Sequence, residues 1–358
     1  MTDTYDHGGN IFAIARARGV SPEDILDFSA SINPLGLARG VREYVHAGFD
    51  RVLHYPDTDA TELKHELASY HGLKASQVIV ANGSTELIHI APRLVGEGRG
   101  LIIAPAFSEY AKAMSGAGMG IDNLILPSDN GFSFPLETLE KKLEEGFRIL
   151  FLCNPGNPSG ALVPLPVISA IQELCRAAGT FLVLDEAFMD FCEEGSAKHL
   201  VPAGGDAVVL RSMTKFFAIP GLRVGYAIAA PELIVRLQRL RGPWSVNTPA
   251  QLAGIASLRD GEYRKNTLRY IEEERALLSR ELAGIAGLEP CPSSANYLLV
   301  RITGGFTAGD LVKELAGRLI LIRDCSGFEG LDGRFFRVAV RKREENEKLV
   351  EALREILS

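Results

Sequence analysis

Short apolar runs alternate with amphipathic stretches between about residue 59 and residue 230. The apolar runs do not alternate with polar residues, which is typical of strands buried on both faces of a sheet. They span residues 78–81, 101–104, 149–153, 181–184, 207–210 and 224–228. Between them, helical patterns occupy residues 60–70, 85–94, 165–178 and 232–239. This order predicts an α/β fold with helices around a mainly parallel central sheet.

The pattern changes in the last third of the chain. A long, charged stretch at residues 263–282 predicts a helix. Shorter apolar runs predict strands, and they lie at residues 295–301, 319–322 and 335–340. The chain closes with a helical pattern at residues 344–356. Because a chain of 358 residues exceeds the size at which one core stops growing, we expect a second, smaller α+β domain.

Composition narrows the classes of partner. The chain has 38 basic and 45 acidic residues, a net charge of −7 and no basic stripe, which argues against a nucleic-acid partner. Its five cysteines form no CxxC pair, so neither a zinc site nor a disulfide framework is expected. The first residues lack the features of a signal peptide, and no apolar run approaches the ~18 residues of a membrane span. We expect a cytoplasmic protein with a small-molecule ligand, no metal and no membrane partner.

Lys215 is the first candidate for chemistry. It lies just beyond the expected strand at residues 207–210, where open α/β sheets bind ligands. A lone lysine is usually a solvated surface cation, but its neighbours favour another interpretation. The hydroxyls of Ser212 and Thr214 and the guanidinium of Arg223 can together hold a phosphate dianion. A lysine amine beside a phosphate site suits an aldehyde cofactor that carries a phosphate, such as pyridoxal 5′-phosphate (PLP).

Asp185 and Asn157 follow two other expected strands. For a lone Asp at a strand end, a helix N-cap or a structural ion pair is the ordinary interpretation. PLP chemistry needs a carboxylate there because the protonated pyridine ring withdraws electrons from the substrate. Asn157 lies in a rigid Pro- and Gly-rich turn at residues 154–160, where it can donate to the cofactor's ring oxygen or serve only as a turn residue.

A fourth turn, at residues 82–86, joins an expected strand to a helix. The free backbone N–H groups at the start of that helix, around Ser84 and Thr85, form an anion site. The turn lacks GxGxxG spacing, so a dinucleotide site is poorly supported. Phe107 is a candidate to stack on the pyridine ring, although most such aromatic residues belong to the core. The turns that carry Lys215, Asp185, Asn157 and Ser84 thus follow successive expected strands, and together they favour PLP as the cofactor.

These motifs resemble those of the fold-type I PLP enzymes of the class I/II aminotransferase superfamily, over nearly the whole length of the chain. They are Asn-Pro-Gly-Asn-Pro-Ser-Gly at residues 154–160, Asp-Glu-Ala-Phe at residues 185–188, and Ser-Met-Thr-Lys with Gly-Leu-Arg-Val-Gly-Tyr at residues 212–226. The resemblance implies a large PLP-binding domain and a small C-terminal α+β domain, joined at the active site by an N-terminal segment. The expected ranges are residues 46–240, 241–358 and 1–45.

The resemblance also assigns roles to single residues. Lys215 would form the Schiff base, Asp185 would pair with the pyridine nitrogen, and Asn157 would contact the ring hydroxyl. The cofactor phosphate would be held by Ser84, Thr85, Ser212, Thr214 and Arg223. Phe188 stands where many relatives have a tyrosine, so it cannot donate to the ring oxygen. Tyr55 would reach the phosphate in a neighbouring subunit, which implies a homodimer.

Within the superfamily, the sequence is most similar to threonine-phosphate decarboxylases of cobalamin biosynthesis and close to histidinol-phosphate aminotransferases. The segments that favour the decarboxylases span residues 7–10, 27–36, 210–223, 242–247, 320–325 and 330–341. This similarity implies that Arg323 and Arg337 bind the substrate carboxylate and phosphate, without deciding which arginine takes which group. Further substrate contacts are implied for His7, Gly8, Ser31, Asn33 and Asn157.

The expected reaction converts O-phospho-L-threonine to (R)-1-aminopropan-2-yl phosphate and CO2, with Lys215 returning a proton to Cα. PLP alone does not choose between decarboxylation and transamination, because the orientation of the substrate decides which bond breaks. The main alternative is a histidinol-phosphate aminotransferase, which would share every cofactor residue. Two further alternatives are a PLP-binding protein without turnover and a nucleotide-binding α/β protein.

Overall fold

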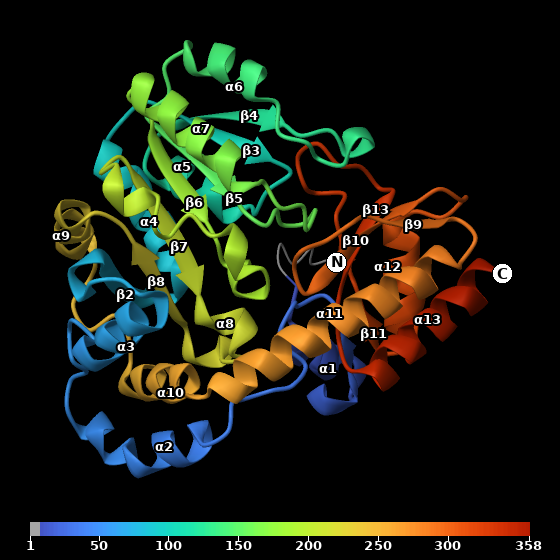
Figure 1. Cartoon of the computed structure of the whole chain (residues 1–358). Helices are drawn as coiled ribbons and strands as arrows, with labels where there is room; N and C mark the ends of the chain where they lie inside the picture. Colours follow the sequence, from blue (N-terminus) through green and yellow to red (C-terminus); the bar gives the residue numbers. More distant parts are fainter. Residues whose placement is uncertain (1–7) are drawn as a thin grey trace.

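A computed structural model describes residues 8–358 of the chain. Its largest sheet has seven strands in the order β2-β8-β7-β6-β5-β3-β4 (Figure 1). Strand β8 runs antiparallel to both neighbours, and the other adjacent pairs are parallel, which confirms the predicted α/β fold. The strands are β2 (Val78–Asn82), β3 (Arg99–Ala104), β4 (Gly120–Ile125), β5 (Ile149–Cys153), β6 (Phe181–Asp185), β7 (Ala207–Ser212) and β8 (Val224–Ile228).

Helices cover both faces of this sheet. Successive strand residues point to opposite faces, so Phe151 of β5 packs into one core and Leu150 packs into the other. Helices on the Phe151 side are α4 (Gly83–Val95), α5 (Glu109–Gly116) and α9 (Pro231–Leu240). Helices on the Leu150 side are α3 (Thr61–His71), α6 (Leu136–Leu143), α7 (Leu165–Ala177) and α10 (Thr248–Arg259). This double burial explains why the predicted strands are apolar without alternation.

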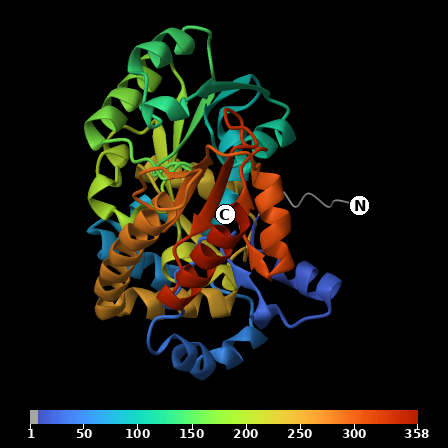
Figure 2. The ribbon, with the colours of Figure 1, turned by 90° about the vertical axis from the view of Figure 1, so that its right-hand side faces the viewer.

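The C-terminal part forms a small domain around an antiparallel sheet in the order β12-β13-β10-β9. Its strands are β9 (Leu288–Pro290), β10 (Tyr297–Ile302), β12 (Arg323–Asp324) and β13 (Phe335–Ala339). Its helices are α12 (Ala308–Gly317) and α13 (Arg343–Leu357). The long helix α11 (Gly261–Ala283) leads into it from the large domain (Figure 1). Seen from the side, this orange and red part lies in front of the large sheet (Figure 2).

The N-terminal segment connects the two domains. After α1 (Ile11–Arg18), strand β1 (Leu26–Asp27) pairs in parallel with β11 (Ile320–Leu321) of the small domain. The chain then crosses to the large domain, where α2 (Val41–Ala47) packs against α10. No helix within residues 8–358 combines the length and the apolar character that crossing a bilayer requires.

Two features differ from the sequence-based expectation. Strand β4 was not predicted because it is a largely exposed edge strand that contains Asp122 and Asn123, so it has no continuous apolar run. Helix α10 lies within residues 241–358, the range expected for the small domain, yet it packs against α2 and α3 of the large domain. The chain enters the small domain along α11, later than residue 241, because the apolar side of α10 completes the large-domain core.

Candidate active site

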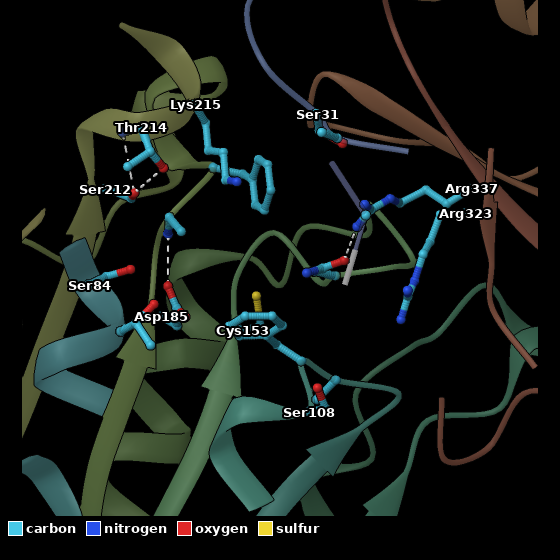
Figure 3. A pocket seen from close by; sticks show the side chains of 18 of the residues that line it. Ser31, Ser84, Ser108, Cys153, Asp185, Ser212, Thr214, Lys215, Arg323 and Arg337 are labelled. Atoms are coloured by element: carbon cyan, nitrogen blue, oxygen red, sulfur yellow. Dashed lines mark hydrogen bonds between the residues drawn. The ribbon is translucent and has the colours of Figure 1, made fainter. Parts of the chain in front are cut away.

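A pocket lies between the carboxyl ends of the large-sheet strands and the small domain (Figure 3). We call its two sides the large-domain wall and the small-domain wall. The large-domain wall includes Ser84, Thr85, Phe107, Tyr110, Asn157, Asp185, Phe188, Ser212, Thr214, Lys215 and Arg223. The small-domain wall includes Gly8, Ser29, Ser31, Arg323, Phe328 and Arg337. Most of the residues predicted from the four turns and from the C-terminal strands therefore face one cavity.

Lys215 enters the pocket from the short helix α8 (Met213–Phe216). This helix begins directly after β7 because the Ser212 side chain accepts a hydrogen bond from the backbone N–H of Thr214. The pKa of Lys215 is lowered to about 8, mainly by burial and then by the positive charges of Arg337 and Arg223. A lysine with such a pKa is partly neutral at physiological pH, as a nucleophilic amine must be.

Asp185, at the end of β6, has both carboxylate oxygens engaged. Its Oδ1 accepts a hydrogen bond from the backbone N–H of Ala187 (3.0 Å), and its Oδ2 accepts one from the Tyr110 hydroxyl (2.7 Å). Burial raises the pKa of Asp185, whereas these two hydrogen bonds and the charge of Lys215 act in the opposite direction. The carboxylate is therefore held in one orientation at the pocket.

The predicted anion site combines hydroxyl groups and an arginine, and two glycines allow its segments to pack closely against one another. The hydroxyls of Ser212 and Thr214 lie 2.8 Å apart. A Cβ on Gly225 would lie 2.1 Å from the backbone nitrogen of Ser84, so only glycine lets β8 approach the start of α4 this closely. A Cβ on Gly83 would likewise lie 2.7 Å from Nη2 of Arg223. The packing thus brings the donors of three separate turns to one anion site.

Asn157 links the two walls. Its Oδ1 accepts a hydrogen bond from Nη1 of Arg337, which leaves its Nδ2 group as a donor. Phe188 lies beneath the lysine, with its ring centroid 6.0 Å from Nζ of Lys215, and its edge packs against Tyr297. Phe188 carries no hydroxyl, so of these two residues only Asn157 has a side chain that can donate a hydrogen bond to the ring oxygen of a bound cofactor.

Arg323 and Arg337 reach the pocket from neighbouring strands, because they are direct partners in the pairing of β12 with β13. Figure 3 shows both side chains on the side opposite Lys215 and Asp185. Arg337 is buried, and its Nη2 donates to the backbone carbonyl of Ser29 (2.9 Å). The Cζ of Arg323 lies 5.4 Å from the ring centroid of Phe328. The two guanidinium groups give this wall a strong preference for anions.

The structure places two predicted residues, Asn33 and Tyr55, outside the pocket of this chain. Asn33 does not line the pocket, which corrects its expected role as a substrate contact. Its side chain is buried against α8 and α11, where Nδ2 lies 2.8 Å from Phe216 O. Tyr55 is 78% exposed and stacks on Trp244, outside the pocket of its own chain. His7 lies outside the described residues, so its predicted role stays a prediction.

Gly8 and Ser31 of the N-terminal segment both line the pocket. A Cβ on Gly8 would lie 2.3 Å from Ser29 O, so this position has no room for a side chain. The hydroxyl of Ser31 is buried and has no hydrogen-bond partner within residues 8–358. An unsatisfied hydroxyl that faces a pocket is suited to contact a polar ligand.

A buried cluster of charges supports the large-domain wall from behind. Arg211, which is fully buried and directly precedes Ser212, pairs with three carboxylates. The distances are 3.2 Å to Glu186, 3.0 Å to Asp190 and 2.5 Å to Glu193. Burial raises the pKa of Glu186 to about 7, while the charge of Arg211 opposes that rise. Because Glu186 follows Asp185, these ion pairs tie the ends of β6 and β7 together.

Sequence reasoning missed two contributors to the site. Tyr110 is fully buried and stacks on Phe151, with ring centroids 4.9 Å apart. It lies near the start of α5 (Glu109–Gly116), a helix that the sequence pattern did not predict, so no local signal indicated that its hydroxyl reaches Asp185. Ser29 contributes a backbone carbonyl to Arg337, and no property of its side chain indicates this contact.

The profile of the family "Aminotransferase class I and II" matches residues 23–353. The chain belongs to this family. A threonine-phosphate decarboxylase from Salmonella typhimurium is 39% identical over 98% of this chain and 96% of its own length. A histidinol-phosphate aminotransferase from Methanopyrus kandleri is 30% identical over 99% of this chain and 94% of its own length. The crystal structure of the histidinol-phosphate aminotransferase from Clostridium acetobutylicum has a TM-score of 0.87 and 28% identity, and the match covers 93% of this chain and 99% of that chain.

Members of this family use PLP, and this chain is a PLP-dependent enzyme. The residues at the pocket fit the cofactor. Lys215 supplies an amine with a lowered pKa, Asp185 a carboxylate fixed at both oxygens, and Arg223 with its neighbouring hydroxyls an anion site. These groups come from different strand ends of one sheet, where ligands of open α/β folds bind.

Proposed function

We propose that this enzyme removes CO2 from O-phospho-L-threonine and produces (R)-1-aminopropan-2-yl phosphate for cobalamin biosynthesis. The main support is the pair Arg323 and Arg337 on the wall opposite Lys215 (Figure 3). The substrate carries a carboxylate and a phosphate, and each arginine offers a planar pair of donors for one such group. The similarity to the decarboxylase of Salmonella typhimurium supports the same assignment.

The orientation of the substrate decides between decarboxylation and transamination. PLP, when bound, withdraws electrons from the substrate carbon that carries the amino group, so a bond to this carbon weakens. Arginines on the small-domain wall hold the two anionic groups and thereby select the bond to the carboxylate. Such positioning is worth several kcal/mol, which is enough to separate the two reactions.

Lys215 completes the reaction as the proton donor. When CO2 leaves, the electron pair of the broken bond stays with the substrate, and one proton must be added to Cα. The Nζ group of Lys215 has a pKa of about 8, so near neutral pH it can hold this proton and release it. Arg337 and Arg223, whose charges help to lower that pKa, therefore favour the transfer.

A homodimer is part of the proposal. Tyr55 is 78% exposed and Leu53 is 81% exposed, and both lie close in sequence to the exposed Phe49. An exposed apolar surface of this kind is typical of a protein interface. Tyr55 would then serve the pocket of the neighbouring subunit. Sedimentation of the wild type should give twice the chain mass of 38.8 kDa. Tyr55→Ala should weaken the binding of PLP. A monomeric wild type, together with an unchanged PLP affinity of Tyr55→Ala, would contradict the proposed dimer.

Two parallel assays test the reaction. Purified enzyme with O-phospho-L-threonine should release CO2 and the amino-alcohol phosphate, whereas enzyme with histidinol phosphate and 2-oxoglutarate should give no glutamate. A Lys215→Ala variant serves as the inactive control in both. Formation of glutamate without CO2 would identify the enzyme as an aminotransferase. Absence of both products, with intact cofactor absorbance, would indicate a PLP-binding protein without turnover.

A further inference from the structure

Residues 28–33 form a strap between the two domains. Three backbone carbonyls of the strap accept hydrogen bonds from the small domain. The donors are the backbone N–H of Ala339 to Phe28 O (2.9 Å), Nη2 of Arg337 to Ser29 O (2.9 Å) and Nδ2 of Asn296 to Ser31 O (3.1 Å). One end of the strap is therefore bound to the strands that carry the small-domain wall.

The other end of the strap is bound to the helix that carries the lysine. The backbone N–H of Asn33 donates to Lys215 O (3.0 Å), and Nδ2 of Asn33 lies 2.8 Å from Phe216 O. Helix α8 is a single turn, so its C-terminal carbonyls are bound by donors from beyond the helix, and Lys215 O also accepts a hydrogen bond from the backbone N–H of Ala218 (3.3 Å). Asn33 supplies donors to two of them from a site that is 97% buried.

The start of α11 joins the same network. Nδ2 of Asn33 lies 2.8 Å from the Tyr263 hydroxyl and 2.9 Å from Oγ1 of Thr267. The Tyr263 hydroxyl in turn lies 3.0 Å from Phe216 O and 2.7 Å from Gly36 O. Because α11 leads into the small domain (Figure 1), both connections between the domains meet at the backbone of α8.

We propose that Asn33 is a positioning residue that sets the place of Lys215 relative to Arg337 and the rest of the small-domain wall. Only three residues lie between Ser29, which holds Arg337, and Asn33, which holds α8, so the two positions are four residue steps apart. Even a fully extended chain of that length spans at most ~14 Å, so the strap leaves little freedom between the two side chains. The proposal rests on Lys215 as the cofactor lysine and not on the identity of the substrate.

The test uses Asn33→Ala and Tyr263→Phe, which remove the polar groups of the network without touching the pocket. The matched control is Thr180→Val. Thr180 is buried and also donates to a backbone carbonyl, Phe147 O at 2.8 Å, but it directly precedes β6 and so lies at the opposite end of that strand from Asp185. Three properties are measured without substrate: the melting temperature, the rate of PLP attachment to the apoenzyme, and the apparent pKa of the lysine–cofactor linkage from its absorbance.

We expect both network variants to attach PLP about tenfold more slowly, because a small misplacement of a reacting group has a large kinetic effect. Their linkage pKa should shift by ~0.5 units or more, since the lysine moves relative to its charged neighbours. Thr180→Val should lower the melting temperature and leave both other values unchanged. Because the readouts need no substrate, they are independent of the proposed decarboxylation.

A fall in melting temperature for both network variants, with PLP attachment and linkage pKa as in the wild type, would show that the network is merely structural and overturn the proposal. If Asn33→Ala does not fold, Tyr263→Phe decides, because it keeps the buried ring and removes only a hydroxyl. A wild-type enzyme without cofactor absorbance would contradict the role of Lys215 and this proposal with it.

Discussion

The large-domain wall follows the ends of neighbouring strands in one sheet, whereas the small-domain wall is assembled from the N-terminal segment and two C-terminal strands. Behind the first wall lies the buried ion cluster of Arg211, which ties β6 to β7. The second wall depends on contacts between domains, such as those of Arg337 with Ser29 and Asn157. The large-domain wall is therefore supported within its own domain, whereas the place of the small-domain wall is set by contacts between the two domains.

The largest effect should come from Lys215→Ala, because the proposed reaction uses this amine both to attach the cofactor and to return a proton to the substrate. We expect turnover to fall by at least ~10³-fold, as for other groups that act directly on the reacting atoms. The visible cofactor band near ~400 nm should also be lost after dialysis. Lys265→Ala, at a lysine whose side chain is 75% exposed, is the control and should match the wild type. A retained, reducible linkage in Lys215→Ala would refute the assignment.

Arg337→Met tests whether the walls act separately. Loss of a buried charged donor to an anionic substrate group costs ~2–5 kcal/mol, so kcat/KM should fall by roughly 30- to 4,000-fold. The cofactor should still bind with near wild-type affinity. Arg334→Met, at an exposed arginine that pairs with Asp332, is the control and should change neither value. An equal loss of cofactor affinity in Arg337→Met would show that the two walls are not independent.

Arg211→Met tests the support behind the large-domain wall. Removing Arg211 leaves Glu186 and Asp190 without their cation, whereas Glu193 keeps its ion pair with Lys198, and the loss costs about 3–5 kcal/mol of unfolding free energy. Urea unfolding of the apoenzyme measures this change. Arg259→Met is the control, because Arg259 pairs with Glu62 and Glu66 at the surface, where such pairs contribute about 1 kcal/mol or less. Similar losses in the two variants would show that the buried cluster supports the large-domain wall no more than a surface ion pair does.

Tyr110→Phe should have a smaller effect on the same wall. It removes one hydrogen bond to the charged Asp185 without changing the packing of the ring, and such a bond contributes about 1.5 kcal/mol. The PLP dissociation constant should rise about tenfold, as measured by fluorescence titration of the apoenzyme. Tyr70→Phe is the control, because the hydroxyl of Tyr70 has no hydrogen-bond partner within residues 8–358. The PLP affinity of this variant should match that of the wild type. Equal affinities in both variants would contradict a role for Tyr110.

The smallest expected effect is a shift in pH dependence. Only the neutral amine of Lys215 attacks the cofactor, so the rate of PLP attachment to the apoenzyme should rise with pH and level off above a pKa of about 8. Arg337→Met should move this midpoint upward, because the charge of Arg337 contributes to lowering the pKa. Stopped-flow absorbance measures both midpoints. A rate that still rises with pH well beyond 9 in the wild type would contradict the lowered pKa.

Much of the large-domain wall could be predicted because its residues follow apolar strands in short, continuous motifs. The carboxyl ends of parallel strands meet at one edge of the sheet, so Asp185 and Lys215 had to approach each other once the strands were identified. Tyr110 escaped prediction because nothing in a helical pattern indicates which buried tyrosine faces a carboxylate. The edge strand β4 was missed because its polar residues interrupt the apolar pattern.

The apolar runs along the chain were enough to predict the α/β sheet, and the short motifs that follow them were enough to predict the cofactor, because both depend on residues close together in sequence. The opposition of Arg337 to Lys215 depends on strand register and on how the two domains meet, and local patterns carry neither. Asn33 illustrates the same limit: the resemblance implied a substrate contact, but in the folded chain its side-chain amide donates to Phe216 O of α8. Long-range packing sets the direction of a side chain, so the partner of a polar residue is known only once distant segments are in place.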